Sequence, residues 1–161
     1  MLNMIKKEEV WIYLSLTQQD LMSEGKFLID FVKEQHFKDY SFLVFPYAKA
    51  YEGFLKQLFL DLEFISHHDY ISDHIRIGKL MSPHLIRRLG EESVYAKIRD
   101  AAGEDLAHEI WEVWKVGRNE VFHYYPHNIK SLSHQQAIGV AEKILHTMVS
   151  GYQKLKMEIE S

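Results

Sequence analysis

Residues 40–65 read YSFLVFPYAKAYEGFLKQLFLDLEFI and form the most apolar stretch of the chain. The stretch is far too long for a strand, so we predict a long, largely buried helix. Pro46 fits the first turn of this helix, where its missing N–H is tolerated; the alternative is a kink in a helix that begins near Tyr40. This stretch favours an all-α fold.

Weaker signals on the N-terminal side extend the helical pattern. The sequence TQQD at 17–20 resembles a capping box, and apolar residues at spacings of three and four follow it. We therefore predict a helix over about 17–35. β-Branched and aromatic residues at Glu9–Leu16 favour a short strand there, and no other segment has that pattern.

The C-terminal half contains two further helix predictions. One helix is expected from Glu104 to about Phe122, ended by Pro126, and the other begins at Ser133, where SHQQ forms a capping box with Gln136. The last helix carries a heptad seam of apolar residues at 138, 141, 145, 148, 152, 155 and 159. The seam packs either inside the bundle or against a second copy of the chain, because periodicity does not separate the two.

The segment between these helices, residues 67–103, breaks into shorter pieces. Ser82-Pro83 is a typical helix start, and Gly90 and Gly103 are typical helix stops. A length of 161 residues fits one domain. We therefore predict a single domain over 1–161, an all-α helical bundle with an up-down core of four to five long helices and shorter helices in the middle.

Composition narrows the chemistry and the environment. The chain has no Cys, which excludes disulfides, iron–sulfur clusters, Cys-type zinc sites and thiol catalysis. No apolar run approaches the roughly 20 residues that span a bilayer, and no signal-peptide layout is present, so we expect a cytoplasmic protein without a membrane partner. The 10 His raise a metal enzyme as an alternative, but HExxH spacing and paired ExxH motifs are missing, so no metal or other cofactor is expected.

Charge is distributed unevenly along the chain. The formal net charge is −4, yet residues 76–99 alone carry +4. The bases of this segment are Arg76, Lys79, Arg87, Arg88, Lys97 and Arg99, and its acids are Glu91 and Glu92. Such a segment either attracts phosphates, with an affinity that falls as salt rises, or is a solvated helix face.

Two charged residues, Glu52 and Arg118, interrupt apolar helix faces. The faces consist of Phe45, Ala48, Leu55 and Phe59, and of Trp111, Trp114, Val121 and Phe122. Because an isolated buried charge is costly, we predict that the two groups are desolvated and face each other across the bundle. Their contact is either a structural salt bridge or a site for an anionic substrate. Gly53, beside Glu52, lets another segment or a ligand approach closely.

His123 is the third candidate residue. It follows Arg118 by five positions, about 140° away on an ideal helix, so the two converge only where the helix unwinds. The approach to Pro126 supplies such an ending, because the residue before a proline leaves the helical region. An imidazole with an ordinary pKa of about 6.5 suits proton transfer near neutrality. Glu52, Arg118 and His123 are therefore the candidate catalytic residues.

The run RNEVFHYY at 118–125 resembles the RNxxxH signature of the HEPN superfamily and the longer Rx4HxY form of HEPN toxins, with Tyr125 as its last residue. FPYAKAYEGFLKQLFLDL and the later GRNEVFHYYP look most like the toxin subunit of ribonuclease LS-type toxin–antitoxin systems. In those toxins a Glu on an earlier helix joins the Arg and His, and Glu52 matches it. Full-length toxins of that type also carry N-terminal domains that 161 residues cannot hold.

The resemblance implies a metal-independent endoribonuclease whose substrate RNA is cleaved by its own 2′-OH, leaving a 2′,3′-cyclic phosphate. It implies proton transfer by His123 and contact of Arg118 with phosphate oxygens, while Glu52 either orients Arg118 or acts as the base. Asn119 would contact the substrate or orient His123. Tyr125 resembles the acceptor of nucleotidylation by a partner antitoxin.

HEPN sites of this kind form at a dimer cleft, so the resemblance also implies a homodimer with a composite active site. The expected role is a toxin of a toxin–antitoxin or phage-defence system. The alternative is a non-catalytic HEPN module that binds RNA, a nucleotide or a protein partner. In that case aromatic residues such as Trp111 and Tyr124 would stack on bases, although aromatics at helical spacing are more often core.

Overall fold

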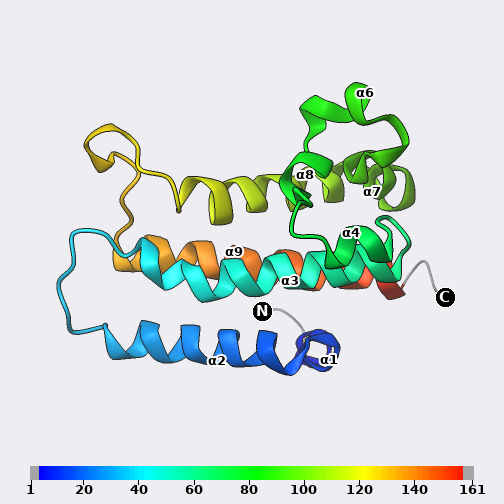
Figure 1. The fold of residues 1–161 in the computed structure, drawn as a ribbon. Helices are drawn as coiled ribbons and strands as arrows, with labels where there is room; N and C mark the ends of the chain where they lie inside the picture. The colour runs from blue at the N-terminus through cyan, green and yellow to red at the C-terminus, as the bar shows by residue number, and fades with distance from the viewer. Residues whose placement is uncertain (1–3, 158–161) are drawn as a thin grey trace.

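The computed structural model describes residues 4–157, and every regular element within them is helical, which confirms the predicted all-α fold. Four long helices form the bundle: α2 (Leu16–Phe31), α3 (Phe45–Asp61), α8 (Glu104–Trp114) and α9 (His134–Gly151). Helices α3 and α9 lie side by side in the middle, with α2 on one side and α8 on the other (Figure 1). Helices α2 and α8 run opposite to α3 and α9, which is the predicted up-down order.

Shorter elements complete the chain. They are α1 (Met4–Tyr13), α4 (His67–Ile71), α5 (Ile77–Leu80), α6 (Ile86–Leu89) and α7 (Val94–Ala102), with 3₁₀ turns at Ser41–Val44, Pro83–Leu85, Gly90–Glu92 and Pro126–Asn128. Wider π-helical turns at Lys115–Glu120 and Tyr152–Met157 extend α8 and α9. Helices α4 to α7 form one segment between α3 and α8, at one end of the bundle (Figure 1).

Helix α3 supplies the centre of the core because its apolar residues lie on several faces. Tyr51, Phe54 and Phe59 are fully buried, and the Tyr51 hydroxyl donates a hydrogen bond to the Ile110 carbonyl on α8 at 3.1 Å. Pro46 occupies the first turn of α3, as expected, directly after a 3₁₀ turn.

The strand predicted at Glu9–Leu16 is wrong, because α1 covers Met4–Tyr13. Val10 and Leu14 lie four positions apart and are both buried, so they present one helical face to the core. The next helix begins at Leu16 rather than at residue 17. Its N-cap is Ser15, whose side chain accepts from the Gln18 amide, and the Gln18 side chain accepts from the Ser15 amide.

Other helix boundaries agree with the sequence. The Ser133–Gln136 capping box is present, and the Ser82 hydroxyl accepts a hydrogen bond from the amide of His84. Gly90 and Gly103 follow the last residues of α6 and α7 with φ values of 55° and 97°, which glycine adopts without strain.

The heptad seam of the last helix is partly intramolecular. Ala141, Met148 and Leu155 are buried in this chain, whereas Leu145 is 36% exposed. The buried face also includes Ala137, Ile144 and Gly151, so it follows a helical period close to 3.6 rather than a strict heptad. Ile159 lies outside the described residues. Within residues 4–157, no helix combines the length and apolar character needed to span a membrane.

Candidate active site

Glu52 and Arg118 meet across the bundle, as predicted. Arg118 Nε lies 3.4 Å from Glu52 Oε2, and the two residues come from the middle of α3 and from the π-helical turn after α8. The carboxylate also contacts Lys56 Nζ at 3.2 Å, one turn further along α3. One carboxylate is therefore shared by two cations.

The pair is less buried than predicted. The Glu52 and Arg118 side chains are 29% and 38% exposed, and Phe45, the first residue of the expected apolar stripe, is itself 50% exposed. Val44 and Ala48 are buried on either side of Phe45, so α3 stays in the core here and only the side that carries Phe45 and Glu52 faces outward. The contact therefore lies at the rim of the bundle, where an exposed ion pair stabilises the fold by at most about 1 kcal/mol.

The Arg118 guanidinium is held between aromatic rings. Its central carbon lies 5.9 Å from the Trp114 ring and 5.2 Å from the Phe122 ring centroid. Only Nε contacts a carboxylate, and the two terminal amino groups have no hydrogen-bond partner among residues 4–157. A guanidinium has five donors in a planar fork, so most of them remain available to an anion.

The π-helical turn at Lys115–Glu120 places these residues. Gly117 is buried there against Ile144 of α9, and a Cβ at Gly117 would lie 3.0 Å from the Ile144 side chain. The close approach brings the turn onto the centre of the bundle and presents the next residue, Arg118, toward α3. Single π turns occur frequently at functional sites.

Glu52 and Arg118 line two neighbouring cavities. One, of about 380 Å³, also includes Asn119, Trp111 and Trp114 together with residues of the α5 region. The other, of about 280 Å³, is lined by Phe45, Lys49 and Phe122 besides the pair. The structure therefore brings three of the predicted site residues, Glu52, Arg118 and Asn119, to one cavity.

His123 does not join them in the described chain. It is exposed, it lines neither cavity, and it forms no hydrogen bond or ion pair with any residue of 4–157. The helical backbone does end before it, as expected, at Glu120. The chain then turns outward, so Phe122 rather than His123 stays beside Arg118.

Tyr125 lies in the loop after the π turn and is half-buried. Lys130 Nζ is 4.8 Å from its ring centroid and 2.8 Å from Glu120 Oε2. The hydrogen bond to Glu120 raises the pKa of Lys130. The cluster holds the tyrosine ring against the end of the π turn.

Asp39 was not identified from the sequence, yet it anchors the same loop. Its carboxylate accepts hydrogen bonds from Ser41, from the Asn128 side chain at 2.9 Å and from the Leu132 amide at 3.1 Å. Partial burial alone would raise the pKa of Asp39, but these hydrogen bonds outweigh it and lower the pKa to about 2. Only Ser41 is a local partner; Asn128 and Leu132 lie 89 and 93 positions away, so their contacts with Asp39 leave no local pattern in the sequence.

Gly53 and Gly78 are both places of close approach. A Cβ at Gly53 would lie 2.6 Å from the Gln18 side-chain nitrogen, so the segment that approaches α3 closely at Gly53 is α2. A Cβ at Gly78 would lie 2.6 Å from Trp114 Nε1, and that indole N–H is buried with no hydrogen-bond partner. This unpaired donor belongs to Trp114, which lines the 380 Å³ cavity, and no sequence pattern predicts it.

No group of three or more His, Asp or Glu side chains within residues 4–157 is arranged to hold a metal ion. Comparison of the chain with protein-family models, with curated proteins and with solved structures finds no match.

Proposed function

We propose that this chain is an endoribonuclease of HEPN type that needs no metal ion. The observation that carries the proposal is the 3.4 Å contact between Glu52 and Arg118, which lie 66 positions apart. Both charges interrupt apolar helix faces, and Arg118 is the first residue of the RNxxxH motif. Asn119, the next motif residue, lines the same cavity. A surface salt bridge alone would not require the RN pair of the motif to open onto one cavity.

The proposed reaction is an in-line displacement at phosphorus. The 2′-oxygen of the RNA forms a bond to the adjacent phosphorus while the bond from phosphorus to the 5′-oxygen breaks. A base removes the 2′-OH proton, and an acid protonates the departing 5′-oxygen, so the products are a 2′,3′-cyclic phosphate and a 5′-OH. The free amino groups of Arg118 would bind the non-bridging oxygens, where negative charge accumulates.

Glu52 and His123 would supply the proton transfers or hold the groups that do. Glu52 already touches Arg118, so it either orients the guanidinium or takes the 2′-OH proton. His123 suits the other transfer because imidazole changes charge near neutrality. Asn119 would contact the substrate in the cavity or orient His123.

His123 must then reach the phosphate from another direction, and we propose that a second copy provides it. In a twofold dimer the exposed His123 of one chain would face the Glu52–Arg118 pair of the other, which makes the site composite. Phe45 and Phe122 pack edge to face beside Arg118, and both are partly exposed, which suits a contact surface at this place.

The biological setting belongs to the same proposal. We propose a cytoplasmic toxin of a toxin–antitoxin or phage-defence system, with an antitoxin that modifies Tyr125. The loop position of Tyr125, close to the end of the π turn, would let a modification there obstruct the site.

A second function is supported by the exposure of His123. Without an imidazole at the Glu52–Arg118 pair, the cavity would bind RNA, a nucleotide or a protein partner and cleave nothing. The two functions differ in one measurable property, which is the cleavage of RNA by wild type.

The test is RNA cleavage by the purified chain in the presence of EDTA. We expect cleavage to persist in EDTA, to yield 2′,3′-cyclic phosphate ends, and to fall by about 100-fold or more in Arg118→Ala and in His123→Ala. Arg87→Ala on α6, which also removes one surface guanidinium, serves as the control and should cleave normally. Absence of cleavage by wild type would contradict the nuclease and favour the binding module, and equal cleavage by wild type and His123→Ala would contradict the proposed role of His123.

A further inference from the structure

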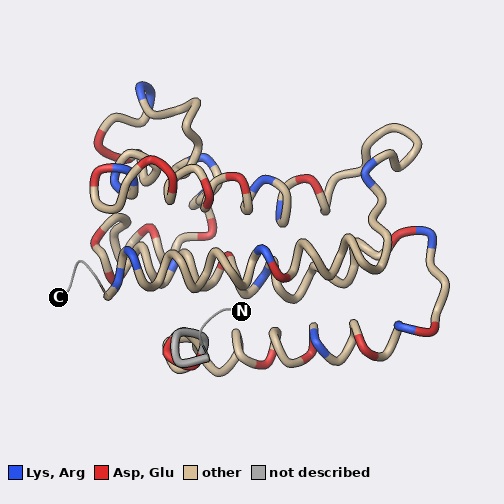
Figure 2. Tube along the Cα trace, turned by 180° about the vertical axis from the view of Figure 1, so that it is seen from behind, with Lys and Arg blue, Asp and Glu red and all other residues tan. Residues whose placement is uncertain are grey.

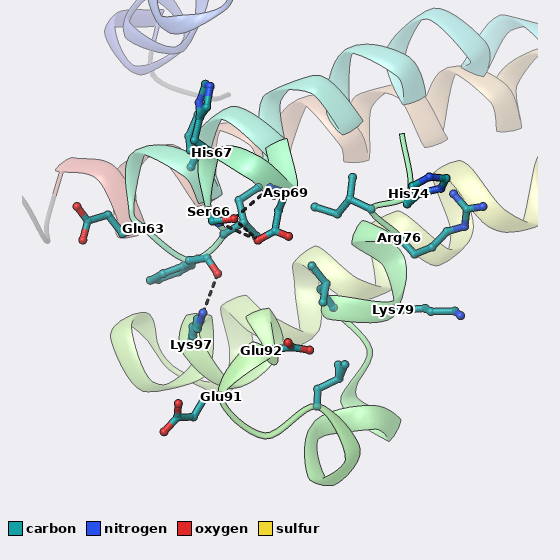
Figure 3. Close-up of a pocket in the computed structure, with 16 residues that line it drawn as sticks. Glu63, Ser66, His67, Asp69, His74, Arg76, Lys79, Glu91, Glu92 and Lys97 are labelled. Carbon is teal, nitrogen blue, oxygen red and sulfur yellow. Dashed lines mark hydrogen bonds between the residues drawn. The ribbon is translucent and has the colours of Figure 1, made fainter. Parts of the chain in front are cut away.

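Arg76 and Lys79 lie at the junction of two cavities. Both line the 380 Å³ cavity that contains Arg118, and both also line a wider hollow of about 860 Å³ between the end of α3 and the α4–α7 segment. Figure 3 shows that both side chains extend in one direction, away from Glu91 and Glu92. The two cavities therefore share one short basic segment in their walls.

The Arg76 and Lys79 side chains have no polar partner in the described part of the chain. Neither Arg76 nor Lys79 forms a side-chain hydrogen bond or ion pair with any other residue of 4–157, and both are exposed. Lys97, in the same hollow, differs because its ammonium donates to the Phe64 carbonyl at 2.7 Å (Figure 3). Arg99 likewise contacts Asp100 at 2.9 Å.

The 380 Å³ cavity carries an excess of positive charge. Its cations are Arg76, Lys79 and Arg118, and its acid is Glu52, which already contacts Lys56 and Arg118. A concave surface with free cations concentrates a field that favours anions. The volume lies within the range of about 300–1,000 Å³ that is typical of small-ligand sites, so one nucleotide fits.

Aromatic groups complete the lining. Trp111 is half-buried in the wall of this cavity, where its ring can stack on a base. Trp114 contributes the buried, unpaired indole N–H beside Gly78. That N–H has almost no exposed surface and lies against Gly78, so a ligand in the cavity does not reach it, and Trp111 is the aromatic group available for stacking.

We propose that Arg76 and Lys79 bind successive phosphates of single-stranded RNA, whose path enters the Arg118 cavity past α5. The wider hollow does not hold the strand, because four acids line it, Glu63, Asp69, Glu91 and Glu92, against the three cations Arg76, Lys79 and Lys97. The proposal rests on the proposed function for the identity of the ligand as RNA. It divides the basic segment 76–99 into two parts. Arg76 and Lys79 face the path, whereas the α6 pair Arg87–Arg88 lines neither cavity and lies at the outer end of the α4–α7 segment (Figures 1 and 2).

The test is the salt dependence of RNA binding, measured by fluorescence anisotropy with a labelled single-stranded oligoribonucleotide. His123→Ala is the parent protein, so that cleavage does not interfere. Each lost phosphate contact on a single strand lowers the slope of log K against log salt by about 0.7. We therefore expect the added pair Arg76→Ala and Lys79→Ala to lower the slope by about 1.4.

The matched control adds Arg87→Ala and Arg88→Ala to the same parent, which removes the same charge from the same segment. The control should keep the parental slope, and circular dichroism checks that all proteins fold. Equal slopes for the two pairs would overturn the proposal, as would an absence of RNA binding by the parent.

The outcomes for this proposal and for the nuclease are distinguishable. If wild type cleaves RNA through His123 but the Arg76 and Lys79 changes leave both slope and cleavage unaltered, the path is wrong and the nuclease stands. If the slopes differ as expected but wild type does not cleave RNA, the path stands and the chain is a binding module.

Discussion

The carboxylate of Glu52 lies 3.2 Å from Lys56 and 3.4 Å from Arg118, at a partly exposed place. Glu52→Gln keeps the size of the side chain and removes its charge. We expect the free energy of unfolding to change by less than about 1 kcal/mol, because exposed ion pairs contribute little. RNA cleavage should fall by about 100-fold, because either the base or the group that orients Arg118 is lost.

Urea unfolding and cleavage rates over a range of pH check this prediction, with Glu24→Gln on the exposed face of α2 as the charge-matched control. Loss of the acidic limb of the pH profile would identify Glu52 as the base, and a uniformly lowered profile would identify it as the group that orients Arg118. Unchanged cleavage would leave the contact as a salt bridge alone.

Gly78 permits α5 to pack against the indole of Trp114. Gly78→Ala places a Cβ 2.6 Å from a buried ring atom, and the ring has little room to move. We expect a loss of about 1–3 kcal/mol in the free energy of unfolding, the usual cost of overpacking.

The matched control is Gly139→Ala on α9, where the added Cβ meets no atom within 4 Å. This change should stabilise the chain by about 0.5–1 kcal/mol, because alanine favours a helix interior. Chemical denaturation measures both, and equal stabilities of the two variants would contradict the close approach at Gly78.

The contact between Glu52 and Arg118 was predictable because each charge falls on an apolar stripe of its own helix. The exposure of these two side chains was not predictable, because a stripe of apolar residues shows which face of the helix packs inward but not how deeply the helix is buried. The position of His123 was also beyond the sequence, since it depends on the course of a loop whose anchors, Asp39 and Lys130, follow no local pattern.

At the scale of the helix, the N-cap of α2 is Ser15 and not Thr17, at which the sequence pattern places the capping box. Ser15→Ala removes the side chain that accepts from the Gln18 amide, so we expect a loss of about 1 kcal/mol in stability. Thr17→Ala lies within the first turn and should change stability by a few tenths of a kcal/mol. Thermal unfolding of the two variants is the measurement, and a larger loss for Thr17→Ala would place the cap at residue 17.

Helix boundaries that depend on local chemistry were predicted well. The capping box at Ser133, the start at Ser82 and the stops at Gly90 and Gly103 involve residues within three positions of one another. The first helix was missed because its β-branched and aromatic residues favour a strand locally, while burial of Val10 and Leu14 favours a helix. The π turn was missed because it depends on the contact of Gly117 with α9.

At the scale of the whole molecule, the separation of His123 from Arg118 within one chain predicts rescue between inactive chains. A mixture of Arg118→Ala and His123→Ala chains, unfolded and refolded together, would form dimers in which one site holds Arg118 from one chain and His123 from the other. We expect such mixtures to regain part of the cleavage that each variant lacks alone. Absence of rescue in a mixed dimer, verified by mass, would contradict the composite site.

The hydrogen bonds of Asp39 connect the beginning of the 3₁₀ turn before α3 with the loop before α9. A carboxyl with a folded pKa of about 2, below its ordinary 3.8, stabilises the fold fully above about pH 4. This stabilisation is lost as pH falls toward 2. Asp39→Asn should therefore be less stable than wild type at pH 7, and the difference should narrow between pH 4 and 2.

Urea unfolding at several pH values measures that difference, with Asp73→Asn on an exposed loop as the control. A difference that stays constant down to pH 2 would show that the Asp39 charge is not what stabilises the loop.

The loop that carries His123 and Tyr125 is fastened on both sides, by Glu120 with Lys130 and by Asn128 with Asp39. Between these fastenings, Val121 packs against the core and Phe122 lies beside Arg118, whereas Tyr124 and His127 are exposed and can vary in sequence without disturbing the helices. Natural variation in this short stretch would alter which molecules the chain recognises while the scaffold persists, so new targets could arise by a handful of substitutions.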